Sequence, residues 1–135
     1  VLIYDDQREP SPRPHFLNDW LKNSHGNVSA IVDNNGMCHG FGRIRPCVLE
    51  DNEQGWRIGP LLADTPPLAE LLIRELVGDL DSQILLDCSN LNPYANYLLS
   101  SLGFEEISKT YRMYKGIQPF CPMNQVYGLA CLELG

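Results

Sequence analysis

The spacing of hydrophobic residues changes along the chain between two and about 3.6 positions, which predicts strands alternating with helices. After Asp64, leucines recur at helical spacing while charged residues occupy the opposite face, as in an amphipathic helix. The predicted helices cover residues 15–21, 66–80 and 92–102. The predicted strands cover residues 1–4, 28–32, 37–47, 56–63, 83–88, 105–115 and 125–133.

The order of these elements predicts the arrangement of the sheet. The three strands between residues 28 and 63 follow one another through short turns, so they form an antiparallel meander. A helix separates strands 56–63 and 83–88, and a right-handed crossover of this kind makes its two strands parallel. We therefore expect one α/β (α+β) domain over residues 1–135, with a mixed, mostly antiparallel sheet. Ligands tend to bind in the crevice at the carboxyl ends of such a parallel pair.

The composition excludes some classes of function. The net charge is −7 and the lysines and arginines are scattered, so the chain lacks the basic stripe of a nucleic-acid-binding surface. No apolar run is long enough to span a membrane, and residues 1–14 do not resemble a signal peptide. Five cysteines without a CxxC pair favour reduced thiols over disulfides or a zinc site. We therefore expect a soluble, cytoplasmic protein without a bound metal.

One segment carries a recognisable sequence pattern. Residues 92–104 match the pattern NxxAxxLYxxxGF at its Asn, Ala, Leu, Gly and Phe positions. Asn92 would start the helix near the crevice, Ala95 would allow a ligand to approach closely, and Gly103 would permit the turn that follows. This pattern, placed after the fifth strand of the fold, resembles the signature of the GNAT family of N-acetyltransferases.

The rest of the chain supports this resemblance. It is similar to the C-terminal GNAT-like domain of the YitH type, which occurs in tandem acetyltransferase-like proteins. The sequence also begins without Met, so we expect it to be the C-terminal part of a longer protein. Its expected partner is an N-terminal GNAT domain or a second copy of the chain. The matching segments are 40–47, 57–61, 63–64, 112–114 and 132–135.

The resemblance implies an acetyl-CoA site in the crevice. In GNAT enzymes the backbone of the fourth strand pairs with the pantetheine arm, so we expect a free edge on strand 56–63. A glycine-rich R/QxxGxG loop then wraps the pyrophosphate at the start of the next helix. The implied reaction is attack of a small amine on the thioester of acyl-CoA. The cofactor-binding residues that the resemblance implies are Leu61, Leu62, Ala63, Thr65, Leu68, Asn92 and Ala95.

The chain departs from the family pattern in the phosphate-binding loop. Residues 64–67 read Asp-Thr-Pro-Pro, without a glycine or a basic residue. Pro66 and Pro67 lack the amide N–H that a helix start offers to an anion, and Asp64 adds a negative charge. Thr65 and Pro66 are explained equally well as the cap and first residue of an ordinary helix.

The chain also departs from the family at the general acid. The position seven residues after Asn92 carries a tyrosine in the family and Leu99 here. Tyr94 and Tyr97 face other directions on the helix, so we expect them to be surface or packing residues. The candidate catalytic base is Asp87, because it lies at the carboxyl end of strand 83–88.

Three hypotheses follow from these patterns. The first is an acyl-CoA-dependent N-acyltransferase that acts on a small amine, supported by the family resemblance. The second is a non-catalytic GNAT-like domain for binding or regulation, supported by the altered loop and by Leu99. The third is an unrelated α/β binding domain, which requires the match over residues 92–104 to be coincidental.

Overall fold

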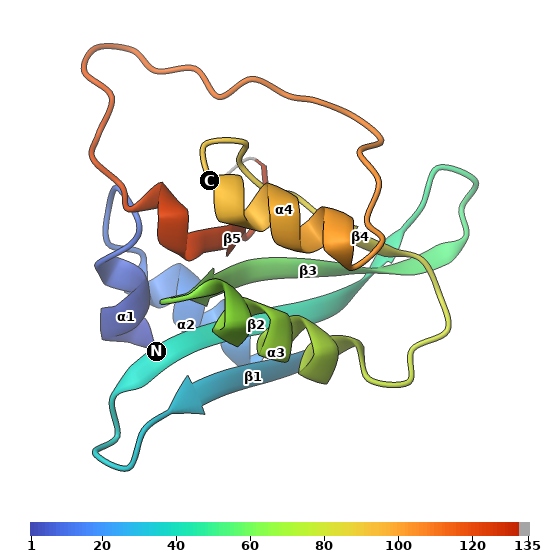
Figure 1. The fold of residues 1–135 in the computed structure, drawn as a ribbon, viewed down its shortest axis with the longest axis horizontal. Coiled ribbons are helices and arrows are strands. Elements are labelled where there is room, and N and C mark those ends of the chain that lie inside the picture. The colour runs from blue at the N-terminus through green and yellow to red at the C-terminus, as the bar shows by residue number, and fades with distance from the viewer. Residues whose placement is uncertain (133–135) are drawn as a thin grey trace.

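The computed structural model describes residues 1–132 and shows a mixed sheet with helices on both faces (Figure 1). Within these residues the strand order is β1-β2-β3-β4, and a fifth strand, β5, pairs with β3. The strands are β1 Asn27–Val32, β2 Cys38–Val48, β3 Gln54–Ala63, β4 Ile84–Leu86 and β5 Val126–Gly128. The helices are α1 Leu2–Asp6, α2 Pro14–Lys22, α3 Pro66–Val77 and α4 Pro93–Ser101, with a 3₁₀ turn at Met123–Gln125.

The central strand β3 makes the parallel pair that the sequence predicts. Strands β1, β2 and β3 are antiparallel neighbours. Helix α3 then returns the chain, so that β4 runs parallel to β3 with Trp56 opposite Ile84. The predicted α/β fold with a mixed, mostly antiparallel sheet is confirmed.

Each face of the sheet has its own hydrophobic core. Helices α3 and α4 cover one face, where Leu72, Leu76 and Leu98 pack against strand residues such as Ile44 and Ile58. Burying a leucine of this kind contributes about 1.5–3 kcal/mol. The glycine predicted to end α4 does so, because Gly103 has a φ of 84°.

Helices α1 and α2 cover the opposite face of the sheet. Tyr4 of α1 and Leu17 of α2 pack there against Phe41 of β2, Leu62 of β3 and Val126 of β5. Successive strand residues point to opposite faces, so β2 and β3 each contribute to both cores. The two cores therefore bury β3 on both faces, from Ile58 to Ala63.

The strand predicted over residues 1–4 is wrong, because residues 2–6 form helix α1. Of residues 1–4, only Tyr4 is buried. Tyr4 and Arg8 lie four residues apart, as on one side of a helix, and both side chains reach Asp64. Contacts with distant residues, rather than the local apolar run, therefore decide the conformation of this segment.

The strand predicted over residues 105–115 is also wrong, because no strand forms there and residues 105–120 are exposed. Ile107, Tyr111 and Met113 alternate as in a strand but are 75–89% exposed. A strand needs a neighbour for its hydrogen bonds, and these residues have none. The last predicted strand is confirmed only over Val126–Gly128, and its predicted end at residue 133 lies outside the described residues.

Candidate functional site

Strand β5 fills the crevice predicted at the carboxyl ends of β3 and β4. Strands β3 and β4 pair over three residues, and β3 then pairs with β5 instead, with Leu62 opposite Val126. Leu129 donates its backbone N–H to the Asp87 carbonyl at 2.8 Å, which fastens this segment to the end of β4. We call residues 126–130 the β5 strap. The expectation of a free edge on β3 is therefore wrong, because the strap occupies that edge.

The strap packs tightly against β3. A Cβ atom at Gly59 would lie far closer to the Leu129 carbonyl oxygen than van der Waals contact allows. The three residues that were expected to pair with pantetheine are fully buried, with no exposed surface. They are Leu61, Leu62 and Ala63.

Asn92, the first residue of the sequence pattern, links helix α4 to the strap. Its side-chain oxygen accepts hydrogen bonds from the backbone N–H groups of Tyr94 and Ala95, both at 3.1 Å, and so caps the helix. Its side-chain nitrogen donates to the Val126 carbonyl at 2.9 Å. Asn92 is completely buried, so all of these partners lie inside the protein.

The start of helix α3 offers little to a phosphate group. Thr65 is the N-cap residue, as predicted, but its side chain makes no capping hydrogen bond. Pro66 and Pro67 have no N–H, and the Ala69 N–H already bonds to the Thr65 carbonyl. Only Leu68 keeps a backbone N–H for an anion in the first turn.

Acetyl-CoA therefore does not fit the crevice as this chain builds it. The strap takes the backbone partners of the pantetheine arm, and α3 lacks the amide groups of a phosphate cradle. The structure brings Leu62 and Asn92 together, because both contact Val126. Leu68 packs against the core that contains Leu61, Ala63 and Ala95, whereas Thr65 is the N-cap of α3. Their predicted roles in cofactor binding stay predictions.

The residues considered for acid–base chemistry have structural partners. Leu99 is 9% exposed and belongs to the core between α4 and the sheet. Tyr94 and Tyr97 are 54% and 81% exposed, so of the two expected roles, surface or packing, the structure shows the surface one. The Asp87 carboxylate forms an ion pair with the Arg57 guanidinium. A catalytic role for Asp87 stays a prediction.

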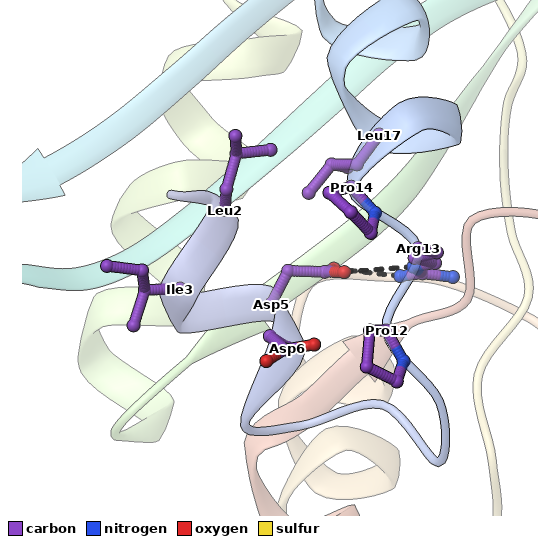
Figure 2. A pocket seen from close by; sticks show the side chains of 8 residues that line it. All are labelled: Leu2, Ile3, Asp5, Asp6, Pro12, Arg13, Pro14 and Leu17. Atoms are coloured by element: carbon purple, nitrogen blue, oxygen red, sulfur yellow. Dashed lines mark hydrogen bonds and ion pairs between the residues drawn. The ribbon is translucent and has the colours of Figure 1, made fainter.

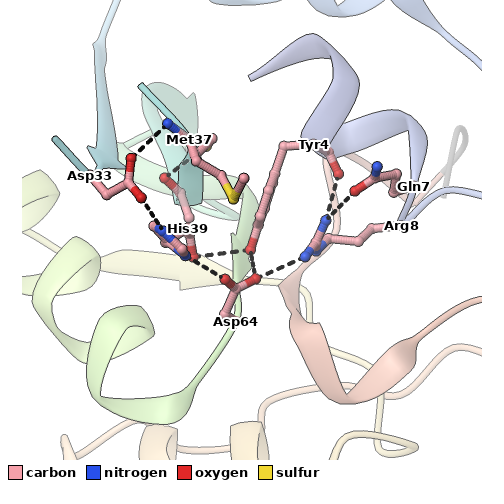
Figure 3. A network of polar contacts seen from close by, with 9 residues as sticks. Tyr4, Gln7, Arg8, Asp33, Met37, His39 and Asp64 are labelled. Carbon is pink, nitrogen blue, oxygen red and sulfur yellow. Dashed lines mark hydrogen bonds and ion pairs between the residues drawn. The ribbon is translucent and has the colours of Figure 1, made fainter. Parts of the chain in front are cut away.

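Asp64, at the end of β3, is the centre of a polar network (Figure 3). Its carboxylate accepts hydrogen bonds from the Tyr4 hydroxyl at 2.7 Å and from Arg8 at 2.8 Å. His39 Nδ1 lies 2.9 Å from the other carboxylate oxygen, and His39 Nε2 lies 3.5 Å from Asp33. The network joins α1, the β1–β2 turn and β3, so Asp64 holds the N-terminal helix against the sheet.

The charges of this network reinforce one another. Hydrogen bonds to Asp64 and Asp33 raise the pKa of His39. Burial opposes ionisation of Asp64, but hydrogen bonds from Tyr4 and His39 and the charge of Arg8 outweigh it, so the pKa of Asp64 is lowered. Burial and the bond to Asp64 raise the pKa of Tyr4. The Asp64 carboxylate is thus satisfied within the chain and has no need of a substrate as partner.

A small pocket of about 200 Å³ lies between α1 and α2 (Figure 2). Leu2, Ile3 and Leu17 give it apolar walls. Arg13 binds both carboxylate oxygens of Asp5 at 2.8 and 2.9 Å, so these opposite charges neutralise each other. The pocket is shallow, and it is lined by α1 and α2, the helices that cover the core around Phe41 and Leu62.

A second pocket, of about 330 Å³, lies where the loop before α2 meets the exposed segment. Glu9, Phe16 and Arg112 line it together with Arg13. Burial raises the pKa of Glu9 to about 7, although the Arg13 charge acts in the opposite direction. The Glu9 carboxylate nevertheless forms an ion pair with Arg13 at 2.8 Å, so it has a partner within the chain.

Neither a metal centre nor a membrane segment is found among residues 1–132. No group of three or more His, Cys, Asp or Glu side chains there is arranged to hold an ion. The longest helix in this range, α3, is too short to cross a bilayer. The five cysteines are free thiols, each partly buried.

Sequence reasoning missed two features that shape the site. The sequence predicts a strand that includes the strap, but residues 126–130 resemble any short apolar strand and do not indicate that it pairs with β3. The signal for the Asp64 network is stronger, because Asp64 directly follows the most apolar strand, where a lone carboxylate needs hydrogen-bond partners. The partners themselves, Tyr4, Arg8 and His39, were not recognisable, since they come from three separate segments.

Comparison with known proteins agrees with this architecture. Holothin acyltransferase of Pseudoalteromonas sp. (strain SANK 73390) is 27% identical over 137 residues. The match covers 100% of this chain and 45% of that protein, so the chain spans less than half the length of this relative. Two crystal structures of variants of the BH1408 protein from Bacillus halodurans share the fold, with TM-scores of 0.60 and 0.59 at 18% identity. In both cases the match covers 76% of this chain and 74% of the other.

A family model gives the broader assignment. The model of the acetyltransferase (GNAT) domain matches residues 1–128, from α1 to β5. This range includes the parallel strand pair, the Asn92 pattern and all but the last two residues of the strap. The chain therefore belongs to the family of acetyltransferase (GNAT) domains.

Proposed function

We propose that this chain is an accessory domain of an N-acyltransferase that modifies a small amine. The name of the relative, holothin acyltransferase, supports acyl transfer as the reaction of the whole protein. In this proposal the acyl-CoA site belongs to a second domain, such as the N-terminal GNAT domain that we expect from the sequence. The chain described here contributes stability, contacts or small-molecule binding, rather than the chemical step.

The observation that carries the proposal is the pairing of β5 with β3. Leu62 and Val126 form a backbone ladder at the edge where pantetheine binds in the family. A strand added to a sheet edge uses up its N–H and C=O groups, so a second occupant has no partners there. The prolines at the start of α3 reduce phosphate binding independently.

The second candidate is acyl transfer in this crevice itself. The family assignment and the parallel pair of β3 and β4 favour it. It requires the strap to leave β3 before acyl-CoA enters. The two candidates therefore differ in whether the folded chain binds acyl-CoA.

Calorimetric titration of the chain with acetyl-CoA distinguishes them. We expect no heat of binding at concentrations up to about 1 mM, and no change in the melting temperature. A site with a dissociation constant one hundredth of the ligand concentration would raise the free energy of unfolding by about 2.7 kcal/mol, which is easily measured. Saturable binding by the unmodified chain would overturn the proposal in favour of the second candidate.

The strap can be loosened as a companion test. Asn92→Ser keeps a helix-capping hydroxyl but is too short to reach the Val126 carbonyl. In the full-length protein we expect this variant to lose thermal stability and to keep the KM for acyl-CoA. A rise in that KM would contradict the proposal, because it would place acyl-CoA at the strap.

A further inference from the structure

Two arginines of β2 stack on one tryptophan at the face covered by α2. Arg43 and Arg45 are two residues apart, so both side chains point to the same face of the sheet. Each guanidinium carbon lies 5.0 Å from the centre of the Trp20 ring. Trp20 is held in place by a hydrogen bond from its ring nitrogen to the Gly59 carbonyl at 3.2 Å. We call Trp20, Arg43 and Arg45 the arginine–tryptophan cluster.

The positive charges of this cluster have no acidic partner within residues 1–132. In that range no carboxylate oxygen lies within 4.0 Å of either guanidinium. The Nε atoms of Arg43 and Arg45 are both buried without a hydrogen-bond partner. Arg43 donates one hydrogen bond, from Nη2 to the His25 carbonyl at 2.8 Å. By contrast, Arg8 and Arg13 at the other end of the same face are paired with carboxylates.

Burial makes this arrangement unfavourable for the protein alone. Arg43 is 2% exposed. Burial lowers the pKa of Arg43, and the neighbouring charge of Arg45 lowers it further. Stacking on Trp20 compensates for only part of the hydration free energy that Arg43 loses on burial, because a cation–π contact is weaker than solvation of the ion. An anion beside the two guanidinium groups would supply the missing compensation.

A third arginine lies beside the cluster but is already paired with a carboxylate. Arg57 of β3 lies directly opposite Arg45, and like charges in that position repel. Arg57 is neutralised by Asp87, so the excess charge remains on Arg43 and Arg45. Arg45 and Trp20 are both partly exposed, so a ligand in solvent can contact the cluster at Arg45. The remainder of the chain is acidic, so this positive patch is local.

We propose that the arginine–tryptophan cluster binds an oxyanion, the carboxylate or phosphate group of a small-molecule ligand. The Arg45 guanidinium contacts the oxyanion as a fork, because planar guanidinium groups match the two oxygens of such groups. Arg43 lies deeper in the protein and supplies a second positive charge to the same site. None of the three residues takes part in the acyl-CoA crevice of the family, so the proposal stands or falls separately from the proposed function.

Fluorescence of Trp20 gives a direct test. The chain has two tryptophans, so Trp56→Phe leaves Trp20 as the only tryptophan, which can be excited without the tyrosines. This variant is titrated with sodium phosphate and, separately, with sodium acetate, each replacing sodium chloride at a constant ionic strength near 0.15 M. We expect a saturable change in emission below about 50 mM, a range typical of a weak single-group contact. Saturation by phosphate alone identifies a phosphorylated ligand, whereas saturation by both salts identifies oxyanions in general.

Matched variants show whether the arginines are responsible. Arg45→Gln removes the charge and keeps most of the side-chain length, and we expect it to weaken binding at least about tenfold. Arg74→Gln makes the same change of charge on the exposed face of α3 and should titrate like the parent. Circular dichroism checks that each variant is folded. Absence of saturation with both salts, or equal titration of Arg45→Gln and the parent, overturns the proposal.

Nuclear magnetic resonance provides an independent measurement on the unmodified chain. The Nε–H groups of Arg43 and Arg45 have no partner in the described part of the chain, and an oxyanion bound to the same guanidinium groups shifts their resonances. We expect these two signals to move during the phosphate titration while the Arg74 signal stays in place. Movement of Arg74 to the same extent would reveal a general salt effect and contradict a specific site.

Discussion

Replacement of Asn92 tests the link between helix α4 and the strap. Asn92→Ala removes two capping bonds, which together contribute about 1 kcal/mol. It also leaves the buried Val126 carbonyl without its side-chain donor, which costs about 1–3 kcal/mol. The expected loss in the free energy of unfolding is therefore about 3 kcal/mol. For a domain of this size such a loss lowers the melting temperature by roughly 10 °C.

Urea denaturation followed by circular dichroism measures this loss, and two variants divide it. Asn92→Ser restores the cap alone and should recover about 1 kcal/mol. Ser100→Ala, on the exposed side of the same helix, serves as control and should change stability by less than about 0.5 kcal/mol. If Asn92→Ala is as stable as the parent, Asn92 does not hold the strap, and our account of the crevice is refuted.

Three further predictions address the same surroundings. The buried hydroxyl of Tyr127 has no hydrogen-bond partner within residues 1–132, and burial raises its pKa to about 12. Tyr127→Phe should therefore stabilise the chain by about 1 kcal/mol in urea denaturation, and a loss of stability would reveal a hidden partner. The raised pKa of His39 means that its stabilising contribution is complete below about pH 6.5 and is lost as the pH rises through the raised value. His39→Gln should therefore weaken the decline of unfolding free energy above that pH, and an unchanged profile would exclude His39 as its source. Gly59→Ala should displace the strap and lower stability by about 1–3 kcal/mol, with faster proteolysis near residue 129; full protection there would contradict the packing.

The fold could be predicted where local pattern and tertiary contacts agree. The leucine spacing of α3 and the turn at residues 33–36 are strong local signals, and the crossover rule then made β3 and β4 parallel. Residues 1–4 show the opposite case. Their apolar run favours a strand, but Tyr4 forms a helix because its hydroxyl binds Asp64, sixty positions away in the sequence. No local signal reports such a contact.

The candidate site was predicted less completely than the fold. The altered loop at residues 64–67 and the loss of tyrosine at Leu99 were visible directly in the sequence. The sequence did not indicate which segment pairs with β3, because residues 105–115 and 125–133 both show strand patterns and either could pair with its edge. That competition depends on side chains such as Asn92, which holds Val126 from across the fold. The sequence pattern located Asn92 correctly but implied a cofactor, rather than the strap, as its neighbour.

The exposed segment over residues 105–120 connects the strap to the rest of the domain, so the strap resembles a peptide bound to the sheet through a linker. Strand addition of this kind is how many domains recognise extended peptides, with the partner here carried on the same chain. An extended tether of this length spans roughly 50 Å, enough to reach a neighbouring molecule. Two chains can therefore exchange straps and form an intertwined dimer with the same hydrogen bonds in each half. Exchange competes with self-closure when the protein approaches the effective concentration of the tethered strap, about a millimolar for flexible linkers.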